Sequence, residues 1–492
     1  MPPFTKVANT FSVLLSPTNL AMGESASGKW TMVADQGFEL KFQGFSYWAF
    51  FKYVQEGEAT ISYCSQTLQG WYRADTVGPK QMGCYRASKK GVNVTAPVVT
   101  NAPAISAAPT PVNRDAMRAY VDALNQAQSS WRADLSDPEA EERFLDHAFR
   151  ASILAADPAH QSHVGSAPAP VTRRSANGQT PEARLGLPDY LNWHNVTGQD
   201  FVGPVRDQKH CGDCYAYVTA AIMEASVRVQ TGNQQKIYLS PQHIVSCCPY
   251  TQKCDGGYIV LGGRFAEERA LAEVRCFAEE PEGEAEAPCS WGCDKPEAYW
   301  YATDYRYVGG YYGNCSEEAM LAELAKAPIG VSIYVHSDFQ AYKSGIYRHV
   351  PDNELPAHVR GIAPALPTNH VVLLTGWGTD PVTNTPYWII RNSWGTSWGE
   401  RGYARILRGN NEISIEGKAA TMRTVLDRHP QPHPDGHPEL VPWVIATLAG
   451  LVLVCLVLAV TSLCLGVLAR RYYKRAQIPI YSPVPSNLGS TN

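Results

Sequence analysis

Nine of the 13 cysteines lie within about a hundred residues, and this crowding constrains the fold more than any other feature of the sequence. Disulfides form and persist in oxidising compartments and are rare in the cytosol. Cysteines at this density therefore predict a domain that is cross-linked by disulfides and located outside the cytosol. The nine are Cys211, Cys214, Cys247, Cys248, Cys254, Cys276, Cys289, Cys293 and Cys315.

The length of 492 residues predicts two to four domains, because one domain commonly holds roughly 100–200 residues. With 45% hydrophobic residues, 18% charged residues and 35 prolines, the composition is that of a globular protein with proline-rich connectors. The net charge of −4 gives no reason to expect nucleic acid as a partner.

Changes in the sequence pattern divide residues 1–426 into three segments. Residues 1–90 hold short alternating runs separated by Gly, Ser and Asn, which predicts a small antiparallel β domain. Residues 91–186 combine Pro/Ala-rich patches with two helical patterns, and we interpret them as an activation peptide or linker with a processing site at Arg173-Arg174. Residues 187–426 open with a helical pattern and continue with strand-like runs, which predicts an α+β domain of two lobes.

The C-terminal region carries the pattern of a membrane anchor. Residues 441–469 contain no charge, and about 20 apolar residues suffice to cross a bilayer, so we predict a transmembrane helix; a buried core helix is the alternative. A His/Pro-rich stalk at 427–440 precedes this run and basic residues follow it, which predicts a cytosolic tail at 470–492 and a lumenal catalytic part. The expected protein is a single-pass type I membrane protein of the lysosome, endosome or secretory pathway. Tyr481 begins a Tyr-x-x-apolar pattern that resembles a sorting-adaptor signal.

The residues after Met1 lack the basic start, apolar core and small-residue cleavage site of a signal peptide. We therefore expect a missing upstream segment. Late insertion directed by the C-terminal helix is the alternative.

Four residues of the third segment meet the needs of a thiol peptidase. Cys214 begins a helical pattern, and a helix N-terminus favours the thiolate that acts as nucleophile. Gln208 lies six residues earlier, so its amide can donate to the oxyanion together with the backbone N–H of Cys214. His370 enters a strand-like run and can carry the proton, while Asn392 can accept from the imidazole and determine its tautomer.

The motifs around these four residues resemble the papain family of cysteine peptidases over about 240 residues. They read QKHCGDC, CDGG, NHVVLLTGWG and NSWGTSWGERGY, in that order. The resemblance implies a papain-like fold, with a helical lobe and a β-barrel lobe, and the roles of oxyanion glutamine, nucleophile, histidine and asparagine for the four residues. Trp394 and Trp398 would shield the histidine–asparagine hydrogen bond. Asp213 and Tyr215 replace the serine and tryptophan that are common around the papain nucleophile.

The N-terminal segment resembles a second part of one papain subfamily, dipeptidyl peptidase I or cathepsin C. The stretch from Gly44 to Trp71 is similar to the exclusion domain of that subfamily. An exclusion domain implies a groove that is closed beyond the second pocket and the release of dipeptides from free N-termini through a thioester acyl-enzyme. The aspartate that binds the substrate ammonium in the subfamily would lie before Met1, so an endopeptidase with an open groove is the alternative. A non-catalytic membrane receptor on a peptidase scaffold is a further alternative, which the intact catalytic positions disfavour.

Cysteine pairing follows from the same resemblance. Cys64 and Cys84 align with exclusion-domain cysteines whose partners would lie upstream, unless the two pair with each other or stay free. In the catalytic domain the resemblance implies the pairs Cys211–Cys254, Cys247–Cys289 and Cys276–Cys293.

The resemblance also implies a ligand and a close approach in the second substrate pocket. A chloride ion is the expected cofactor, held by the Tyr307 hydroxyl and by backbone amides at Tyr258 and Val260, and no metal is expected. Gly256 and Gly257 would let the substrate backbone approach closely, because a side chain there would obstruct it.

Three Asn-x-Ser/Thr-type sequons, at Asn93, Asn195 and Asn314, are candidate glycosylation sites on the predicted lumenal side, although Asn314 fails if Cys315 is buried. The expected partners are peptide and protein substrates, the membrane and a sorting adaptor. An oligomer is compatible with the family resemblance.

Overall fold

The computed structural model describes residues 10–426 except 17–18, 24–25, 34–36, 57–58, 75–81, 91–97, 102–113, 146–178, 280–287, 290–297 and 361–367. These residues all belong to one compact unit, Met1–Arg428. The processing site Arg173-Arg174, the sequon Asn93, the stalk, the run 441–469 and Tyr481 lie outside the described residues.

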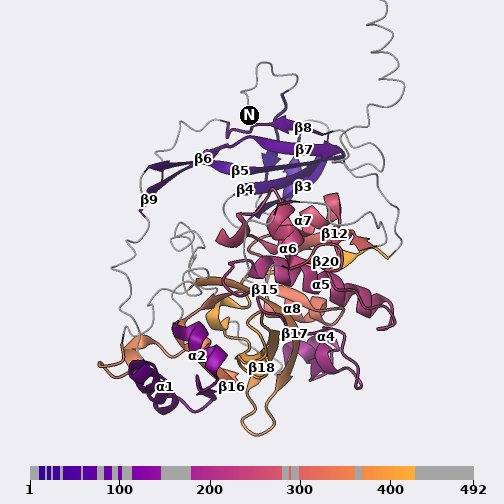
Figure 1. The fold of residues 1–492 in the computed structure, drawn as a ribbon. Helices are drawn as coiled ribbons and strands as arrows, with labels where there is room; N and C mark the ends of the chain where they lie inside the picture. Colours follow the sequence, from indigo (N-terminus) through magenta and orange to yellow (C-terminus); the bar gives the residue numbers. More distant parts are fainter. Residues whose placement is uncertain are drawn as a thin grey trace, which may run out of the picture. The chain divides into compact units, whose positions relative to one another are not determined.

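The N-terminal segment forms an antiparallel sheet, as the alternating pattern predicts (Figure 1). Its main strand order is β1-β2-β3-β4-β5-β6-β9, with β7 pairing with both β5 and β8. Phe38, Leu40 and Phe42 alternate along β4 and point into a small apolar core, because successive side chains of a strand face opposite sides. The strands are β1 (Leu14–Leu15), β2 (Leu20–Met22), β3 (Ser27–Val33), β4 (Gly37–Phe42), β5 (Phe45–Glu56), β6 (Ala59–Thr67), β7 (Gly70–Ala74), β8 (Met82–Tyr85) and β9 (Val98–Asn101).

A two-residue turn determines the register of the β4–β5 hairpin. Phe42 lies opposite Phe45, and the two residues between them have positive φ angles, 54° at Gln43 and 76° at Gly44. This is the geometry of a turn whose twist matches that of the flanking strands. Gly44 adopts its angle without steric cost, because it has no Cβ.

The helical lobe is built around α5 (Cys214–Gln230), which is buried along almost its whole length. A helix that is apolar on all sides requires partners on all sides. It packs against α6 (Pro241–Cys247), α7 (Ile259–Arg269) and strands β17 and β20 of the other lobe. The hairpin of β12 (Leu271–Ala272) and β13 (Tyr299–Trp300) completes this lobe.

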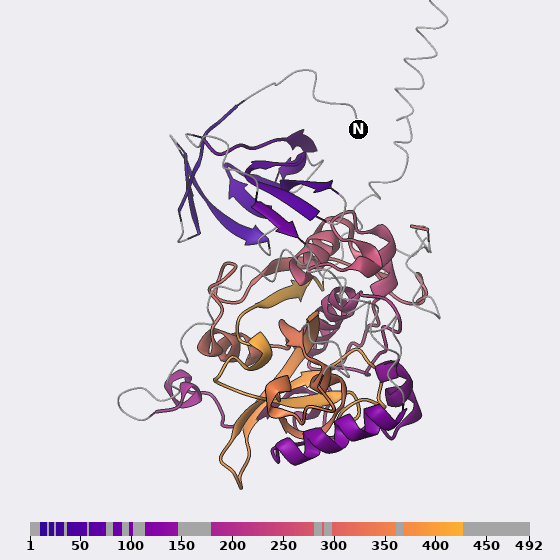
Figure 2. The same cartoon turned by 90° about the vertical axis from the view of Figure 1, so that its left-hand side faces the viewer.

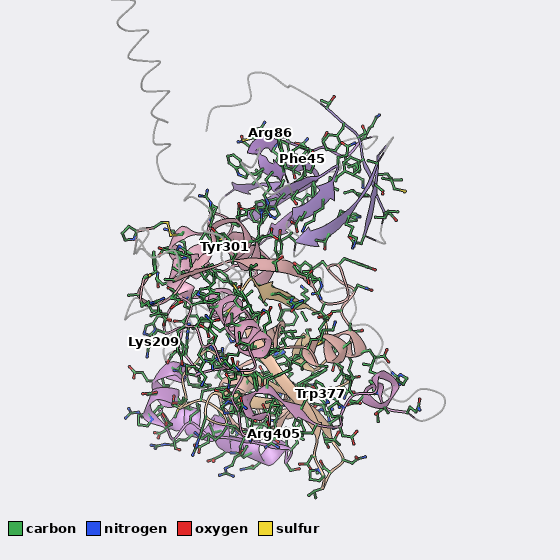
Figure 3. All side chains as sticks on the ribbon, turned by 90° about the vertical axis from the view of Figure 1, so that its right-hand side faces the viewer. Phe45, Arg86, Lys209, Tyr301, Trp377 and Arg405 are labelled. Atoms are coloured by element: carbon green, nitrogen blue, oxygen red, sulfur yellow. A yellow bond between two sulfur atoms is a disulfide. The ribbon has the colours of Figure 1, made fainter. Side chains whose placement is uncertain are left out.

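The second lobe is a largely antiparallel sheet in the order β10-β16-β19-β18-β17-β15-β20-β14, with β11 joined to β17. Trp377 of β17 is fully buried within this sheet (Figure 3), and its indole nitrogen donates to the Pro188 carbonyl at 3.0 Å. The strands are β11 (Leu191–Asn192), β14 (Ala302–Tyr307), β15 (Ile329–Val335), β16 (Tyr342–Tyr347), β17 (Thr368–Thr379), β18 (Pro386–Arg391), β19 (Tyr403–Leu407) and β20 (Ala419–Thr424), with short helices α8 (Glu317–Leu324) and α9 (Ser337–Gln340). The predicted α+β, papain-like arrangement of two lobes is therefore confirmed.

Residues 114–145, in the segment predicted to be an activation peptide or linker, pack against the second lobe. Strand β10 (Trp131–Ala133) extends the large sheet by pairing with β16, with Trp131 opposite Gly345. Helix α1 (Arg114–Ala127) buries Tyr120 and Leu124 in the core of the second lobe, and α2 (Pro138–Leu145) buries Phe144. Figures 1 and 2 both show α1 and α2 alongside the strands of this lobe. Helix α4 (Pro181–Leu185) leads into the catalytic segment.

Polar and aromatic contacts join the N-terminal sheet to the helical lobe and to strand β14 of the second lobe. The Tyr305 hydroxyl of β14 donates to Glu39 of β4 at 2.5 Å, and Arg73 of β7 forms an ion pair with Glu267 of α7. The rings of Trp48 and Tyr250 lie 5.3 Å apart. These contacts place the N-terminal sheet against α7 and β14.

The prediction of a single-pass membrane protein is corrected by the structure. Within the part of the chain that the structure describes, no helix has the length and apolar character needed to cross a bilayer. The 17-residue α5 is too short, since about 20 residues are needed, and it carries Glu224 and Arg228. The run 441–469, on which the prediction was based, lies outside the described residues.

Candidate active site

The N-terminus of α5 positions Cys214, the first residue of that helix. Its thiol is not in a disulfide, and the residue is 9% exposed. Burial raises the pKa of the thiol to about 12, although a backbone hydrogen bond from Val371 works in the opposite direction. The positive end of the helix macrodipole also favours the thiolate at this position.

Strand β17 positions His370, which lies opposite Ile333 of β15. The imidazole Nε2 is 2.8 Å from Oδ1 of Asn392, and because an amide oxygen can only accept, Nε2 carries the proton in this contact. The Nδ1 atom is then left to exchange a proton. Burial lowers the pKa of His370 to about 4, and the hydrogen bond to Asn392 opposes that shift.

Two tryptophans enclose the histidine–asparagine contact. The Trp394 ring stacks on the His370 ring with centroids 4.9 Å apart and an interplanar angle of 23°. Trp398 meets Trp394 edge to face at 5.2 Å, and both indoles are buried. The predicted shielding of the His370–Asn392 hydrogen bond from water agrees with this packing.

The oxyanion candidate Gln208 is held by a residue that the sequence reasoning missed. The Ser393 hydroxyl donates to Gln208 Oε1 at 2.6 Å, and the Gln208 backbone N–H donates to the Ser393 carbonyl at 2.9 Å. The Gln208 amide nitrogen donates one hydrogen to the Cys211 carbonyl at 2.8 Å, which leaves its second hydrogen for a substrate oxygen. Ser393 directly follows Asn392, and a hydroxyl next to a predicted catalytic residue was the available signal.

Gln208, His370 and Asn392 are linked through Asn392 and its neighbour Ser393, and the Cys214 thiol lies at the backbone of Val371, the residue after His370, although the four residues are spread over 185 positions of the sequence. The raised pKa of Cys214 and the lowered pKa of His370 favour a neutral thiol and a neutral imidazole. Such a pair can act by transfer of the thiol proton to the imidazole as the sulfur attacks a carbonyl carbon. The buried setting also strengthens any hydrogen bond to a developing oxyanion.

The two predicted substrate-binding glycines have different structural roles. Gly256 has φ 121° and ψ 178°, a backbone conformation that side chains rarely adopt, and a Cβ there would meet open space. A Cβ on Gly257 would come within 2.8 Å of the Tyr215 ring and 2.9 Å of Thr251. Position 257 therefore requires glycine because a side chain there would collide with Tyr215 and Thr251 inside the protein. Gly256 faces open space, which leaves room for a substrate.

Two of the predicted disulfides, Cys211–Cys254 and Cys247–Cys289, are formed. Cys276 is also disulfide-bonded, and its predicted partner Cys293 lies outside the described residues. Cys84 is free, as are Cys248 and Cys315. The first bridge joins the loop that carries Gln208 to the loop that precedes Gly256.

The predicted chloride residues lie at the start of α7 and at the end of β14. Tyr258 is the N-cap of α7 and makes no side-chain cap hydrogen bond, and Val260 lies in the first turn. Tyr258 and Tyr307 pack against the same helical-lobe core, and the Tyr307 ring meets Tyr312 at 5.3 Å. A helix start without a side-chain cap offers backbone N–H groups and the positive dipole end, so these residues fit a small anion.

Asn195 and Asn314 are both exposed, as glycosylation sites must be. The Asn314 amide nitrogen, which a glycan would modify, donates to the Gly309 carbonyl at 2.7 Å. Cys315 beside it is half-buried and burial raises the pKa of its thiol to about 12. Asn195 is therefore the more accessible of the two.

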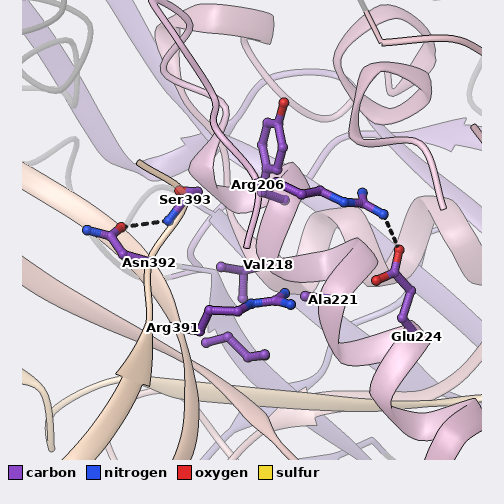
Figure 4. A pocket seen from close by; sticks show the side chains of 9 residues that line it. Arg206, Val218, Ala221, Glu224, Arg391, Asn392 and Ser393 are labelled. Atoms are coloured by element: carbon purple, nitrogen blue, oxygen red, sulfur yellow. Dashed lines mark hydrogen bonds and ion pairs between the residues drawn. The ribbon is translucent and has the colours of Figure 1, made fainter. Parts of the chain in front are cut away.

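A small pocket is lined in part by Asn392 (Figure 4). Val218, Ala221 and Glu224 of α5 form one side, and Arg391 and Asn392 form the other. The Arg391 guanidinium donates to three consecutive carbonyls, of residues 202, 203 and 204. The pocket therefore lies at a polar junction between the two lobes.

Comparisons with known proteins agree with this fold. Residues 187–423 match the papain family cysteine proteases, and residues 1–89 match the cathepsin C exclusion domain. Cathepsin C of Schistosoma mansoni is 32% identical over 409 residues, which cover 81% of this chain and 84% of that protein. The chain belongs to the papain family of cysteine peptidases, and within that family it is similar to cathepsin C.

Other similar proteins cover a smaller share of this chain. A gut-specific cysteine proteinase of Caenorhabditis elegans is 25% identical over 346 residues, covering 65% of this chain and 96% of that protein. Among solved structures, procathepsin B S9 from Trypanosoma congolense is 23% identical with a TM-score of 0.48, covering 64% of this chain and 100% of that chain.

Proposed function

We propose that this cysteine peptidase is a dipeptidyl peptidase, which removes dipeptides from the free N-termini of peptides and proteins. The observation that carries the proposal is an exclusion-type domain packed against α7, the helix that follows the glycine pair. The Tyr305–Glu39 hydrogen bond and the Arg73–Glu267 ion pair hold that domain against β14 and α7. A domain in this position is expected to limit how far a substrate extends beyond its second residue.

The side chains that join the exclusion domain to the peptidase domain are largely buried, which supports a substrate groove that stays closed. The Arg73 and Glu267 side chains are 7% and 24% exposed, and Arg264 of α7 is 2% exposed. Arg264 lies 4.0 Å from Glu39 and 2.9 Å from Glu268. Separating the domains would be costly chiefly for Arg73, which would lose its carboxylate partners on α7, whereas Arg264 would keep Glu268 of its own helix.

The chemistry then follows from the residues already described. His370 accepts the thiol proton of Cys214 while the sulfur attacks the carbonyl carbon of the second substrate residue. Gln208 and the backbone N–H of Cys214 donate to the resulting oxyanion. His370 returns the proton to the leaving amine, and a water molecule, activated by the same imidazole, hydrolyses the thioester and releases the dipeptide.

We also propose that a chloride ion occupies the second pocket. Tyr307 and the first-turn N–H groups of α7, at Tyr258 and Val260, would hold it, and the uncapped start of α7 supports this assignment. The ion would shape the base of the pocket and supply no step of the chemistry.

A comparison of two substrates tests the proposed specificity. The protein is assayed under mildly acidic, reducing conditions with a dipeptidyl fluorogenic amide and with its N-acetylated twin, and the Cys214→Ala variant serves as the blank. We expect cleavage of the free-amine substrate only. Cleavage of both substrates, or of the blocked one only, would contradict the proposal and identify an endopeptidase.

One observation favours the endopeptidase as the second candidate. A dipeptidyl peptidase needs a carboxylate to pair with the substrate ammonium. Glu39 of the exclusion domain, which reaches the peptidase domain, already accepts from the Tyr305 hydroxyl and is 12% exposed. It is therefore unsuited to bind an amine, and the blocked substrate decides between the two activities.

A further inference from the structure

Asp213 directly precedes the nucleophile and is buried without the hydrogen bonds that its position normally provides. It is the N-cap residue of α5, with φ −104° and ψ 23°, and its side chain makes no cap hydrogen bond. An N-cap aspartate usually accepts from the backbone of the first helical turn. Here Asp213 is 4% exposed, and its Oδ1 atom has no hydrogen-bond partner among the described residues.

The ionisable groups that face Asp213 do not neutralise it. On its own helix these are the Cys214 thiol and the hydroxyls of Tyr215 and Tyr217, and from the segment after β12 it is Glu279. None of these is a cation. Burial raises the pKa of the Asp213 carboxyl well above its usual range; a hydrogen bond from its own backbone N–H opposes this shift, and the negative charge of Glu279 adds to it.

The cation in this region, Arg206, is already paired with other carboxylates. Arg206 donates to Glu224 at 2.7 Å and to Glu279 at 3.4 Å. Within the described residues, no ion pair involves Asp213. A buried carboxyl without a cation stays protonated further up the pH scale than an exposed one, since burial penalises its charged form.

A negative charge on Asp213 would affect the Cys214 thiol but not the His370 imidazole. The charge raises the pKa of the neighbouring Cys214 thiol and so opposes the thiolate. The pKa of His370 depends instead on burial and on its hydrogen bond to Asn392, with no contribution from Asp213. Ionisation of Asp213 therefore disfavours the nucleophile without stabilising the imidazolium.

We propose that Asp213 is a positioning residue that sets the upper pH limit of the peptidase. As a neutral carboxylic acid it leaves the Cys214 thiolate undisturbed, and as a carboxylate it suppresses that thiolate and the oxyanion forming beside it. The inference rests on the proposed role of Cys214 as nucleophile. It attributes an upper pH limit to one side chain that differs from the serine common at this position.

The test compares the full chain with its Asp213→Asn variant over a range of pH. Iodoacetamide is reacted with each protein, and the alkylated Cys214 peptide is quantified by mass spectrometry, which separates it from the free Cys84, Cys248 and Cys315. We expect the two rate profiles to coincide at acidic pH and to diverge as pH rises, with the variant about tenfold faster at the alkaline end, the change that one pKa unit represents. The pH profile of kcat/KM should extend to higher pH in the same variant.

A structural role for Asp213 predicts a different result. Loss of packing would lower the rates by the same factor at every pH, and either that uniform change or coincident profiles would overturn the proposal. Asp213→Ser provides a second neutral side chain in case the asparagine variant folds poorly, and it should show the same divergence.

The Glu279→Gln variant should move the upper pH limit in the direction opposite to that of Asp213→Asn. Removing the Glu279 charge favours ionisation of Asp213, so the upper pH limit should move to lower pH, and this shift should vanish when Asp213 is already Asn. A shift that persists in the double variant would contradict the proposal. Absence of Cys214 labelling in the unmodified protein at every pH would instead refute the role of Cys214, which keeps the failure of the proposed function distinguishable.

Discussion

The imidazole Nε2 of His370 lies 2.8 Å from Oδ1 of Asn392, and neither residue is more than 2% exposed. This hydrogen bond holds the ring in one orientation and one tautomer. Asn392→Ala should therefore lower kcat by about 10²-fold with little change in KM, because acid–base catalysis contributes roughly 10²–10⁴-fold and requires that tautomer.

One further variant tests the role of the acceptor oxygen, and a second serves as a control. Asn392→Asp keeps an acceptor oxygen and should retain more activity than the alanine variant. Asn125→Ala, which removes side-chain hydrogen bonds to Ala133 in the segment that contains β10, should leave kcat unchanged. An Asn392→Ala enzyme with normal kcat would show that the hydrogen bond is not needed.

The Ser393–Gln208 contact makes a second prediction. Gln208→Ala should lower kcat by about 10²–10³-fold, the usual cost of losing one oxyanion donor. Ser393→Ala should lower kcat by a smaller factor, on the order of tenfold, because the amide stays present but loses the 2.6 Å bond that orients it. Steady-state kinetics measure both, with Gln242→Ala as a control on another buried glutamine. Equal losses in the Ser393 and Gln208 variants would contradict a purely orienting role.

The ion pair between the domains makes a third prediction. Arg73→Met keeps the length of the side chain but leaves Glu267 of α7 without its partner. The exclusion domain should then hold the groove less firmly, so the rate on the N-acetylated substrate should rise relative to the free-amine substrate, by about three- to tenfold for a loss of roughly 1 kcal/mol.

Lys52→Met is the matched control for this experiment. Lys52 is in the same domain, and its ammonium bonds Gln66 of that domain at 3.4 Å. Its substitution should leave the ratio of the two rates unchanged. A ratio that also stays unchanged in Arg73→Met would show that this pair does not help to close the groove.

The sequence predicted features that depend on neighbouring residues better than features that depend on residues far apart in the chain. Short motifs predicted local features accurately: the helical pattern at 216–230 became α5 (Cys214–Gln230), and the run 386–394 contains β18 (Pro386–Arg391). Alternation likewise identified the N-terminal sheet. These signals work because side-chain periodicity and turn residues act within a few positions.

Features that depend on contacts between residues far apart in the chain could not be predicted from the sequence. Proline-rich flanks suggested an activation peptide or linker at 91–186, and gave no sign that Trp131 pairs with Gly345 across more than 200 positions. Composition cannot reveal such a pairing, because the partner strand is not encoded nearby. The roles of Ser393 and the burial of Asp213 likewise became visible only when the lobes were brought together.

A pair of stacked histidines in the second lobe gives the last prediction. The rings of His336 and His349 lie 3.7 Å apart, and His349 Nδ1 lies 3.1 Å from the buried carboxylate of Asp338. Burial lowers the pKa of His336 to about 4, the charge of His349 lowers it further and Asp338 opposes the shift. The pKa of His349 is raised, mainly because its hydrogen bond to Asp338 outweighs its burial.

The sign of the resulting pH dependence follows from the two states of His336. An unfolded chain binds a proton at His336 near pH 6.5, whereas the folded protein binds it only near pH 4. Stability therefore falls as pH drops from 6.5 to 4, because the unfolded state binds more protons in that window. His336→Phe keeps an aromatic ring on His349 and removes this loss.

Thermal unfolding at several pH values checks the prediction. The difference in Tm between His336→Phe and the unmodified protein should grow in favour of the variant between pH 6.5 and 4, by about 2–4 °C for each kcal/mol recovered. His358→Gln, at an exposed position, should leave the slope unchanged. The raised pKa of His349 changes stability only above pH 6.5, outside this window, so the comparison reports on His336. A constant Tm difference across this window would mean that His336 takes up its proton equally readily in the folded and unfolded chain.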